Sequence, residues 1–74
     1  MNLRERFGKR LVEIRHLRKI TQAQLAEKVG VSVEFISLIE RGINSPSFDT
    51  LEKLAEAMGV QVYELFMFEG SNDN

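Results

Sequence analysis

Few side chains of this 74-residue sequence have the types and spacing that catalysis or metal binding requires. His16 has no histidine, cysteine or carboxylate partner at metal-ligand spacing, so we expect it to face solvent. Ser32 and Ser47 lack a nearby histidine base and are better explained as helix caps than as nucleophiles. Cysteine is absent, which excludes a thiolate metal site and a disulfide framework. We therefore expect no enzyme, no catalytic residue, no metal, no cofactor and no small-molecule ligand.

A different chemistry is available in the segment 33–41, where four side chains share one side of a predicted helix: Val33, Glu34, Ser37 and Leu38. Apolar side chains can contact thymine methyl groups, a carboxylate can accept a hydrogen bond from cytosine N4, and a serine hydroxyl can bond to a base or a phosphate. This pattern predicts a base-reading surface. None of the four offers the bidentate arginine contact to guanine, so we expect DNA shape to supply much of the specificity. The alternative is that Leu38 covers the edge of the core and Glu34 only complements the positive helix N-terminus.

Two short helices joined by a tight turn must position this surface. Ala26 is small enough for a steep helix crossing, and Gly30 is permissive enough for the turn. Val31, Ile36 and Ile39 are expected to fill the wedge between the helices. Such a hairpin holds its second helix clear of the domain, so that the polar side enters a major groove while the first helix spans the DNA backbone.

Capping and glycine signals define the first three helices. The first carries apolar residues at helical spacing: Leu3, Phe7, Leu11, Ile14 and Leu17. It ends near Lys19, and Thr21 with Gln24 then forms a capping box for the second helix. Ser32 caps the third, and Gly42 lies where a left-handed residue is wanted after it.

Ser47 can cap a fourth helix, with these residues on its inner side: Phe48, Leu51, Leu54, Ala55 and Met58. Gly59 closes it, and a fifth helix is predicted from Val62 to about Phe68. The sequence thus predicts an all-α fold, one compact five-helix domain over residues 1–69. A polar tail, residues 70–74, is expected to be disordered.

Five motifs in order carry a resemblance to a known family: TQAQLA at 21–26, GVS at 30–32, IS at 36–37, IERG at 39–42 and SPSFDTL at 45–51. They are similar to the lambda-repressor and Cro type of helix-turn-helix, also called the xenobiotic-response-element family. The resemblance runs from about Phe7 to Phe66, with the helix-turn-helix motif at 22–41. It implies a lambda-repressor-like domain that binds operator DNA as a homodimer and regulates transcription. Stand-alone members include phage repressors, restriction-modification controller proteins and antitoxins.

Carried over by position, the resemblance implies further roles for individual residues. DNA phosphate contacts fall on Gln22, Ser32, Arg41 and the backbone near Asn44. Arg15 and Glu40 correspond to a partly buried, structural ion pair.

Three features depart from the family pattern. Lys19 replaces the usual glycine, so a retained left-handed turn would be strained by ~1 kcal/mol. Positions 43 and 44, often basic, are Ile43 and Asn44, which weakens the expected neutralisation of phosphates. The groove-facing side of the third helix also lacks Arg, Gln and Asn, the residues that discriminate bases best.

The fifth helix offers more apolar surface than one face of a short helix can bury. We expect a homodimer interface there, formed by Val62, Tyr63, Phe66 and Phe68. The alternative is that Leu65 and Val62 complete the core, while Phe66 and Phe68 cover exposed edges.

Charge is unevenly distributed along the chain. Residues 1–19 hold seven basic and two acidic side chains, a net charge of +5, whereas the rest holds three basic and nine acidic ones, a net charge of −6. A folded domain can therefore present a basic face to phosphates despite a formal net charge of −1. The alternative is that both sets are merely solvated helix faces.

Two other functions remain open on the sequence alone. The chain could be an antitoxin or protein-interaction module in which DNA binding is secondary, or a scaffold that no longer binds nucleic acid. No signal peptide or membrane span is visible, so a cytoplasmic protein without a membrane partner is expected.

Overall fold

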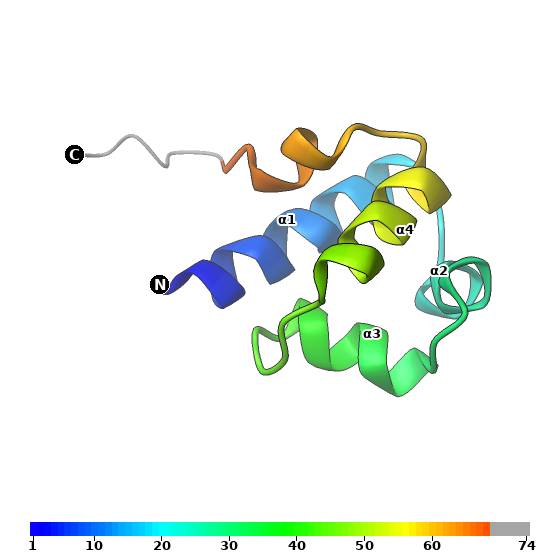
Figure 1. Cartoon of the computed structure of the whole chain (residues 1–74), viewed down its shortest axis with the longest axis horizontal. Coiled ribbons are helices and arrows are strands. Elements are labelled where there is room, and N and C mark those ends of the chain that lie inside the picture. The colour runs from blue at the N-terminus through cyan, green and yellow to red at the C-terminus, as the bar shows by residue number, and fades with distance from the viewer. Residues whose placement is uncertain (69–74) are drawn as a thin grey trace.

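The computed structural model describes residues 1–68, which form four α-helices and one short 3-10 helix. They are α1 (Leu3–Leu17), α2 (Gln22–Val29), α3 (Val33–Glu40), α4 (Phe48–Met58) and η1 (Val62–Phe66). Figure 1 shows α3 and η1 on opposite sides of α1, with α4 between α3 and η1 in this view. The predicted polar tail lies outside the described residues. Within residues 1–68, no helix has the length and apolar character needed to cross a membrane.

Side-chain caps start all four α-helices. Thr21 and Gln24 form the predicted capping box, and Ser32 and Ser47 each accept the amide hydrogen three residues on, at 3.0 and 3.1 Å. Asn2 and Glu5 form a further capping box at the start of α1. These bonds satisfy amide groups that have no partner within the helix.

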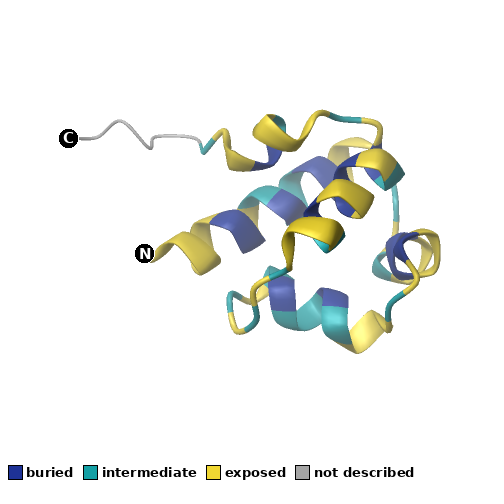
Figure 2. Cartoon of the chain, viewed as in Figure 1, coloured by how far each residue is buried: buried dark blue, intermediate teal, exposed yellow. Residues whose placement is uncertain are grey.

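The core is a single cluster drawn from every helix, and Figure 2 shows it along the inner sides of α1, α3 and α4. Its six fully buried large side chains are Leu11, Leu25, Ile36, Ile39, Leu54 and Leu65. Most of the predicted inner positions of α1 and α4 are therefore confirmed.

Three predicted core positions are wrong: Leu3 is 56% exposed, Leu17 is 75% exposed and Phe48 is 85% exposed. All three lie in a first or last helical turn. Helical spacing assigned these residues to the side of the helix that faces the core. The ends of α1 and α4, however, extend beyond the elements packed against them.

The fifth helix also differs from its prediction. It is a 3-10 turn that ends at Phe66, two residues earlier than expected, and Leu65 is its only buried residue. A segment this short gains few helical hydrogen bonds for the nucleation cost, and β-branched and aromatic residues favour the α-helix only weakly.

Gly8 explains how closely α1 can pack on α3. A Cβ atom there would lie 2.5 Å from the Glu40 carbonyl oxygen and 2.6 Å from that of Ile39. Only a residue without a side chain lets the α1 backbone rest on the end of α3. This contact fixes α3 relative to the first helix.

Candidate nucleic-acid interface

The α2–α3 hairpin has the geometry that its small residues predict. Ala26 is buried, and its carbonyl oxygen accepts amide hydrogens from Gly30 at 2.8 Å and Val31 at 3.0 Å. Gly30 has φ +87°, the left-handed conformation that closes α2. Ile36 and Ile39 are fully buried beneath the hairpin. The opposite side of α3 is consequently directed away from the core.

The predicted base-reading residues lie on this outer side. Val33 and Glu34 are exposed, whereas Ser37 and Leu38 are half-buried. Arg41 follows them one turn later, and its Nε donates to the Ser37 hydroxyl at 3.3 Å. The five positions form a continuous strip of small apolar, acidic, hydroxyl and basic groups.

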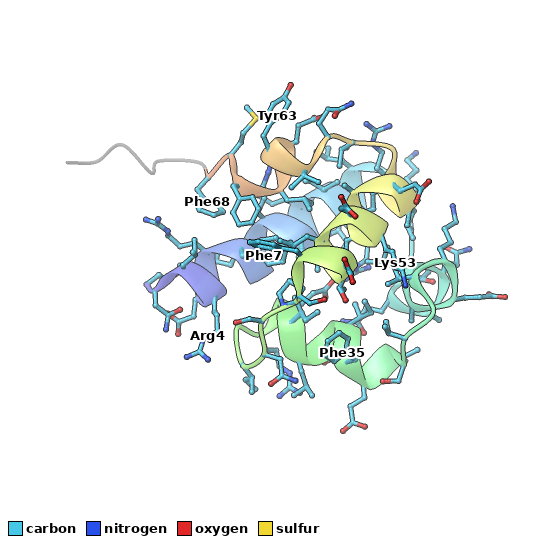
Figure 3. All side chains as sticks on the ribbon, viewed as in Figure 1. Arg4, Phe7, Phe35, Lys53, Tyr63 and Phe68 are labelled. Carbon is cyan, nitrogen blue, oxygen red and sulfur yellow. The ribbon has the colours of Figure 1, made fainter. Side chains whose placement is uncertain are left out.

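Phe35 belongs to the inner side of the helix. It is half-buried, packs against the core and lies between α3 and α4 in Figure 3. The hydroxyl of Ser32, next to the strip, accepts the Phe35 amide hydrogen and keeps its own hydrogen available to donate.

A buried ion pair joins the two ends of the hairpin to α1. Arg15 donates through Nε to Glu40 Oε2 at 2.7 Å and through Nη2 to Glu40 Oε1 at 3.2 Å. Its remaining Nη1 donates to the Ile20 carbonyl oxygen at 3.0 Å. The side chains are only 11% and 5% exposed, so this is a largely desolvated, bidentate pair.

Gln22 extends this network in a way the sequence did not indicate. Its side-chain amide donates to Glu40 Oε1 at 2.8 Å, which holds the first residue of α2 against the last residue of α3. An amide nitrogen carries two hydrogens, so one remains for an external acceptor. Glu40 of the ion pair therefore also orients Gln22, a residue predicted to contact a DNA phosphate.

The turn after α3 is closed by its own backbone. The Leu38 carbonyl oxygen accepts amide hydrogens from Ile43 at 3.0 Å and from Asn44 at 3.3 Å. The Asn44 backbone N–H is thus engaged inside the loop. A phosphate at this corner would have to use the Asn44 side chain or the adjacent groups instead.

The predicted dimer residues differ in their exposure. Tyr63 is 66% exposed, whereas Val62 and Phe66 are each 37% exposed and Phe68 is half-buried. The ring centroid of Phe66 lies 5.2 Å from that of Phe7 and 6.1 Å from that of Phe68, which stands edge-on to it. Tyr63 therefore leaves an aromatic ring free, whereas the packing of Phe66 and Phe68 resembles the alternative in which these rings cover exposed edges.

An apolar groove beside these rings was missed by sequence reasoning. Its volume is about 290 Å³, and its lining residues are Leu3, Arg4, Phe7, Asn44, Ser45, Pro46, Phe48, Leu51 and Phe66. The exposed Phe48 stands at its edge. The available signal was an aromatic residue, Phe48, at the first helical position after a proline and a serine cap, because a side chain at the very start of a helix has few packed neighbours.

Arg10 is a further residue whose role depends on long-range contacts. Its Nε donates to the Glu64 carbonyl oxygen at 2.9 Å and its Nη1 to Glu13 at 3.1 Å. The first bond ties η1 to α1, and the second lies within α1. Within residues 1–68, no group of three His, Cys, Asp or Glu side chains is arranged to hold a metal ion.

Comparison with known proteins gives the same architecture. A family model described as helix-turn-helix matches residues 11–65. The chain belongs to the helix-turn-helix family. The lambda-repressor-like resemblance of its motifs is thereby confirmed, and its function class is that of DNA-binding transcriptional regulators.

Three individual proteins illustrate this helix-turn-helix membership. The immunity repressor of Bacillus phage phi105 is 49% identical over 55 residues, which are 74% of this chain and 38% of the repressor. The restriction-modification controller protein C.AhdI from Aeromonas hydrophila has a TM-score of 0.83 at 33% identity, covering 85% of this chain and 96% of that one. The DNA-binding domain of the P22 c2 repressor has a TM-score of 0.82 at 32% identity, covering 97% and 96%.

Proposed function

We propose that this helix-turn-helix protein binds double-stranded operator DNA as a homodimer and regulates transcription, with α3 in the major groove. The observation that carries the proposal is that α3 buries Ile36 and Ile39 on one side, while the predicted base-reading residues on its outer side are exposed or half-buried. A helix anchored on one side and open on the other can enter a groove without disturbing the core. The Arg15–Glu40 pair and the Gly8 contact support this by holding α3 in place.

Phosphate contacts would lie at both ends of the strip. The start of α2 lies beside the end of α3, where Thr21 satisfies the Gln24 and Leu25 amides and leaves the amide hydrogens of Gln22 and Ala23 for an external anion. The Gln22 side chain, Arg41 and Asn44 supply further groups at this end. At the other end, next to Val33, the Ser32 hydroxyl is a further donor. This arrangement supports a phosphate backbone running across α2 and past the end of α3.

The dimer would form through the exposed apolar surface of η1, with Val62, Tyr63, Phe66 and Phe68 as its predicted residues. The groove continues this surface as far as Phe48. An apolar surface of this kind marks an interaction site, and a two-fold dimer uses the same patch on both subunits. The two α3 helices would then lie ~34 Å apart, one turn of DNA.

The test is a comparison of single alanine variants on a panel of operator sequences, obtained by selection from random duplexes. Val33→Ala, Glu34→Ala and Leu38→Ala should each change the ranking of operator variants. Glu52→Ala, on the exposed side of α4, is the matched control and should bind as the wild type does. If all three α3 variants keep the wild-type ranking and affinity, the base-reading surface is wrong.

A second candidate function is an antitoxin or protein-interaction module in which DNA binding is secondary. The exposed Phe48, which lines an apolar groove, and the exposed Tyr63 of η1 favour it. Retention on heparin and on AT-rich duplex at low and moderate salt discriminates the two. A protein that is retained on neither supports the second function.

A further inference from the structure

The α2–α3 hairpin is poor in basic residues for a DNA-binding surface. Between Thr21 and Pro46 the sequence has only Lys28 and Arg41. Each neutralised phosphate contributes to affinity through counterion release, and the loop after α3 supplies no cation. Additional positive charge at the corner formed by the end of α3 and the Ile43–Ser45 loop must come from another part of the fold.

The first turn of α1 lies directly against this corner. A Cβ atom on Gly42 would be 2.9 Å from the Glu5 Cα and 2.8 Å from its Cγ. Gly42 also has φ +77°, so the chain turns back on α1 immediately after α3. The start of α1 is therefore a neighbour of the α3–α4 loop, although some forty residues separate them in the sequence.

Arg4 occupies this position. It is exposed, and it lines the edge of the apolar groove together with Asn44 and Ser45 of the loop. Figure 3 shows its side chain extending from α1 toward the side of the molecule that carries α3. The ion pairs formed within residues 1–68 are Arg10–Glu13 and Arg15–Glu40, and neither involves Arg4. The neighbouring Glu5 carboxylate accepts the Asn2 backbone amide hydrogen, as part of the α1 capping box, and is not ion-paired with Arg4 within the described residues.

We propose that Arg4 contacts a DNA phosphate and supplies, from α1, the positive charge that Ile43 and Asn44 do not provide. Arg4 and Arg41 then flank the Asn44–Ser45 loop, one from each side. An arginine is suited to this position because its guanidinium can bind a phosphate through two parallel hydrogen bonds. The inference rests on the proposed docking of α3 in the major groove, which brings this corner to the backbone.

The experiment measures the salt dependence of binding for the full chain, by fluorescence anisotropy on an operator duplex and on a random duplex. Arg4→Gln should reduce the magnitude of the slope of log K against log salt concentration by about 1. It should weaken binding to both duplexes by the same factor, about 5- to 10-fold near 0.1 M salt. Arg4→Lys should keep the wild-type slope. Arg18→Gln is the matched control, because Arg18 bonds to the Gly59 carbonyl at the far end of α1 and should leave the slope unchanged.

Each contrary result has a defined meaning. An unchanged slope for Arg4→Gln overturns the proposal. If that variant instead weakens the dimer in sedimentation at constant slope, Arg4 contacts the partner subunit, and the exposed Asp49 beside Phe48 is the acid suited to meet it. If Arg4→Gln lowers the slope while the α3 variants have no effect, the phosphate contact stands and the docking of α3 is wrong.

Discussion

The α2–α3 hairpin and the surface formed by η1 and the groove differ in what they leave uncovered. The hairpin exposes polar and small groups on a helix whose opposite side is anchored by the buried Ile36 and Ile39. The end of that helix is held at Glu40 by Arg15 and Gln22. The second surface exposes aromatic rings, among them Phe48 in the wall of an apolar groove and Tyr63 on η1. Polar groups on a rigid helix suit the edges of bases, and apolar rings suit another protein surface. The two regions therefore point to two kinds of partner, and variants in each should affect different measurements.

Loss of the buried ion pair should give the largest effect, a fall in the free energy of unfolding, because this pair holds the end of α3 in the first region. Glu40→Ala leaves the Arg15 guanidinium buried without its partner, which costs ~3–5 kcal/mol, a large share of the stability of a small domain. Thermal and urea unfolding measure it. Glu56→Ala, on an exposed side of α4, is the control. A Glu40→Ala protein that melts like the wild type would show that the pair contributes nothing to folding.

Removal of an exposed ring from the second region should weaken the dimer without affecting the fold of the α2–α3 hairpin. Phe48→Ser takes away a side chain that is 85% exposed in the monomer, so the fold should survive while the dimer weakens. Loss of the second half-site should reduce operator affinity by ~100-fold, the scale of an avidity gain. Sedimentation and operator titration together measure it, with Lys53→Ser as the control. A wild-type monomer at tens of micromolar would argue against dimerisation.

Charge reversal at Arg41 should sharpen the distinction within the first region between phosphate contact and base reading. Arg41→Glu should weaken binding to all duplexes by a similar factor, ~10-fold or more, since it removes a cation and adds an anion beside the backbone. Binding to operator variants at several salt concentrations measures it. Loss confined to one variant would assign Arg41 to base reading instead.

The smallest effect concerns the turn that leads into the hairpin. Lys19 has φ +58°, a conformation that L side chains adopt only with strain, so Lys19→Gly should raise stability by up to ~1 kcal/mol. Lys9→Gly in the interior of α1 should lower stability by ~1 kcal/mol, which makes it an opposite-sign control. Thermal unfolding measures both. Equal destabilisation by the two glycines would mean that the turn carries no strain.

What the sequence could predict depends on how far apart along the chain the interacting residues lie. Caps such as Thr21–Gln24 and Ser32 were predictable because each bond spans three residues, and the left-handed Gly42 followed from the same local logic. The left-handed turn at Lys19 was expected only from the family resemblance. The exposure of Phe48 was not, because helical spacing gives the side of a helix but not where its neighbours end.

Long-range contacts account for the rest of the candidate site. The Gln22–Glu40 and Arg10–Glu64 hydrogen bonds join residues 18 and 54 positions apart, and no local pattern marks them. The position of Arg4 beside the α3–α4 loop depends in the same way on the contact between Glu5 and Gly42. Sequence alone predicted which residues could contact DNA from the hairpin, but not which residues of α1 the fold brings to the same side.

The contact at Gly8 has a consequence for the operator. α1 bears on α3 through Gly8 and on η1 through the packing of Phe7 against Phe66, so one rigid helix connects the groove-entering element to the proposed dimer surface. In a dimer, the packing of α1 would then set the distance between the two α3 helices. One base pair inserted at the centre of the operator would turn one half-site by about 35° around the duplex axis, since a turn takes 10–10.5 base pairs. We expect the contacts of α1 with α3 and η1 to resist that rotation, so the DNA would have to twist back to be bound.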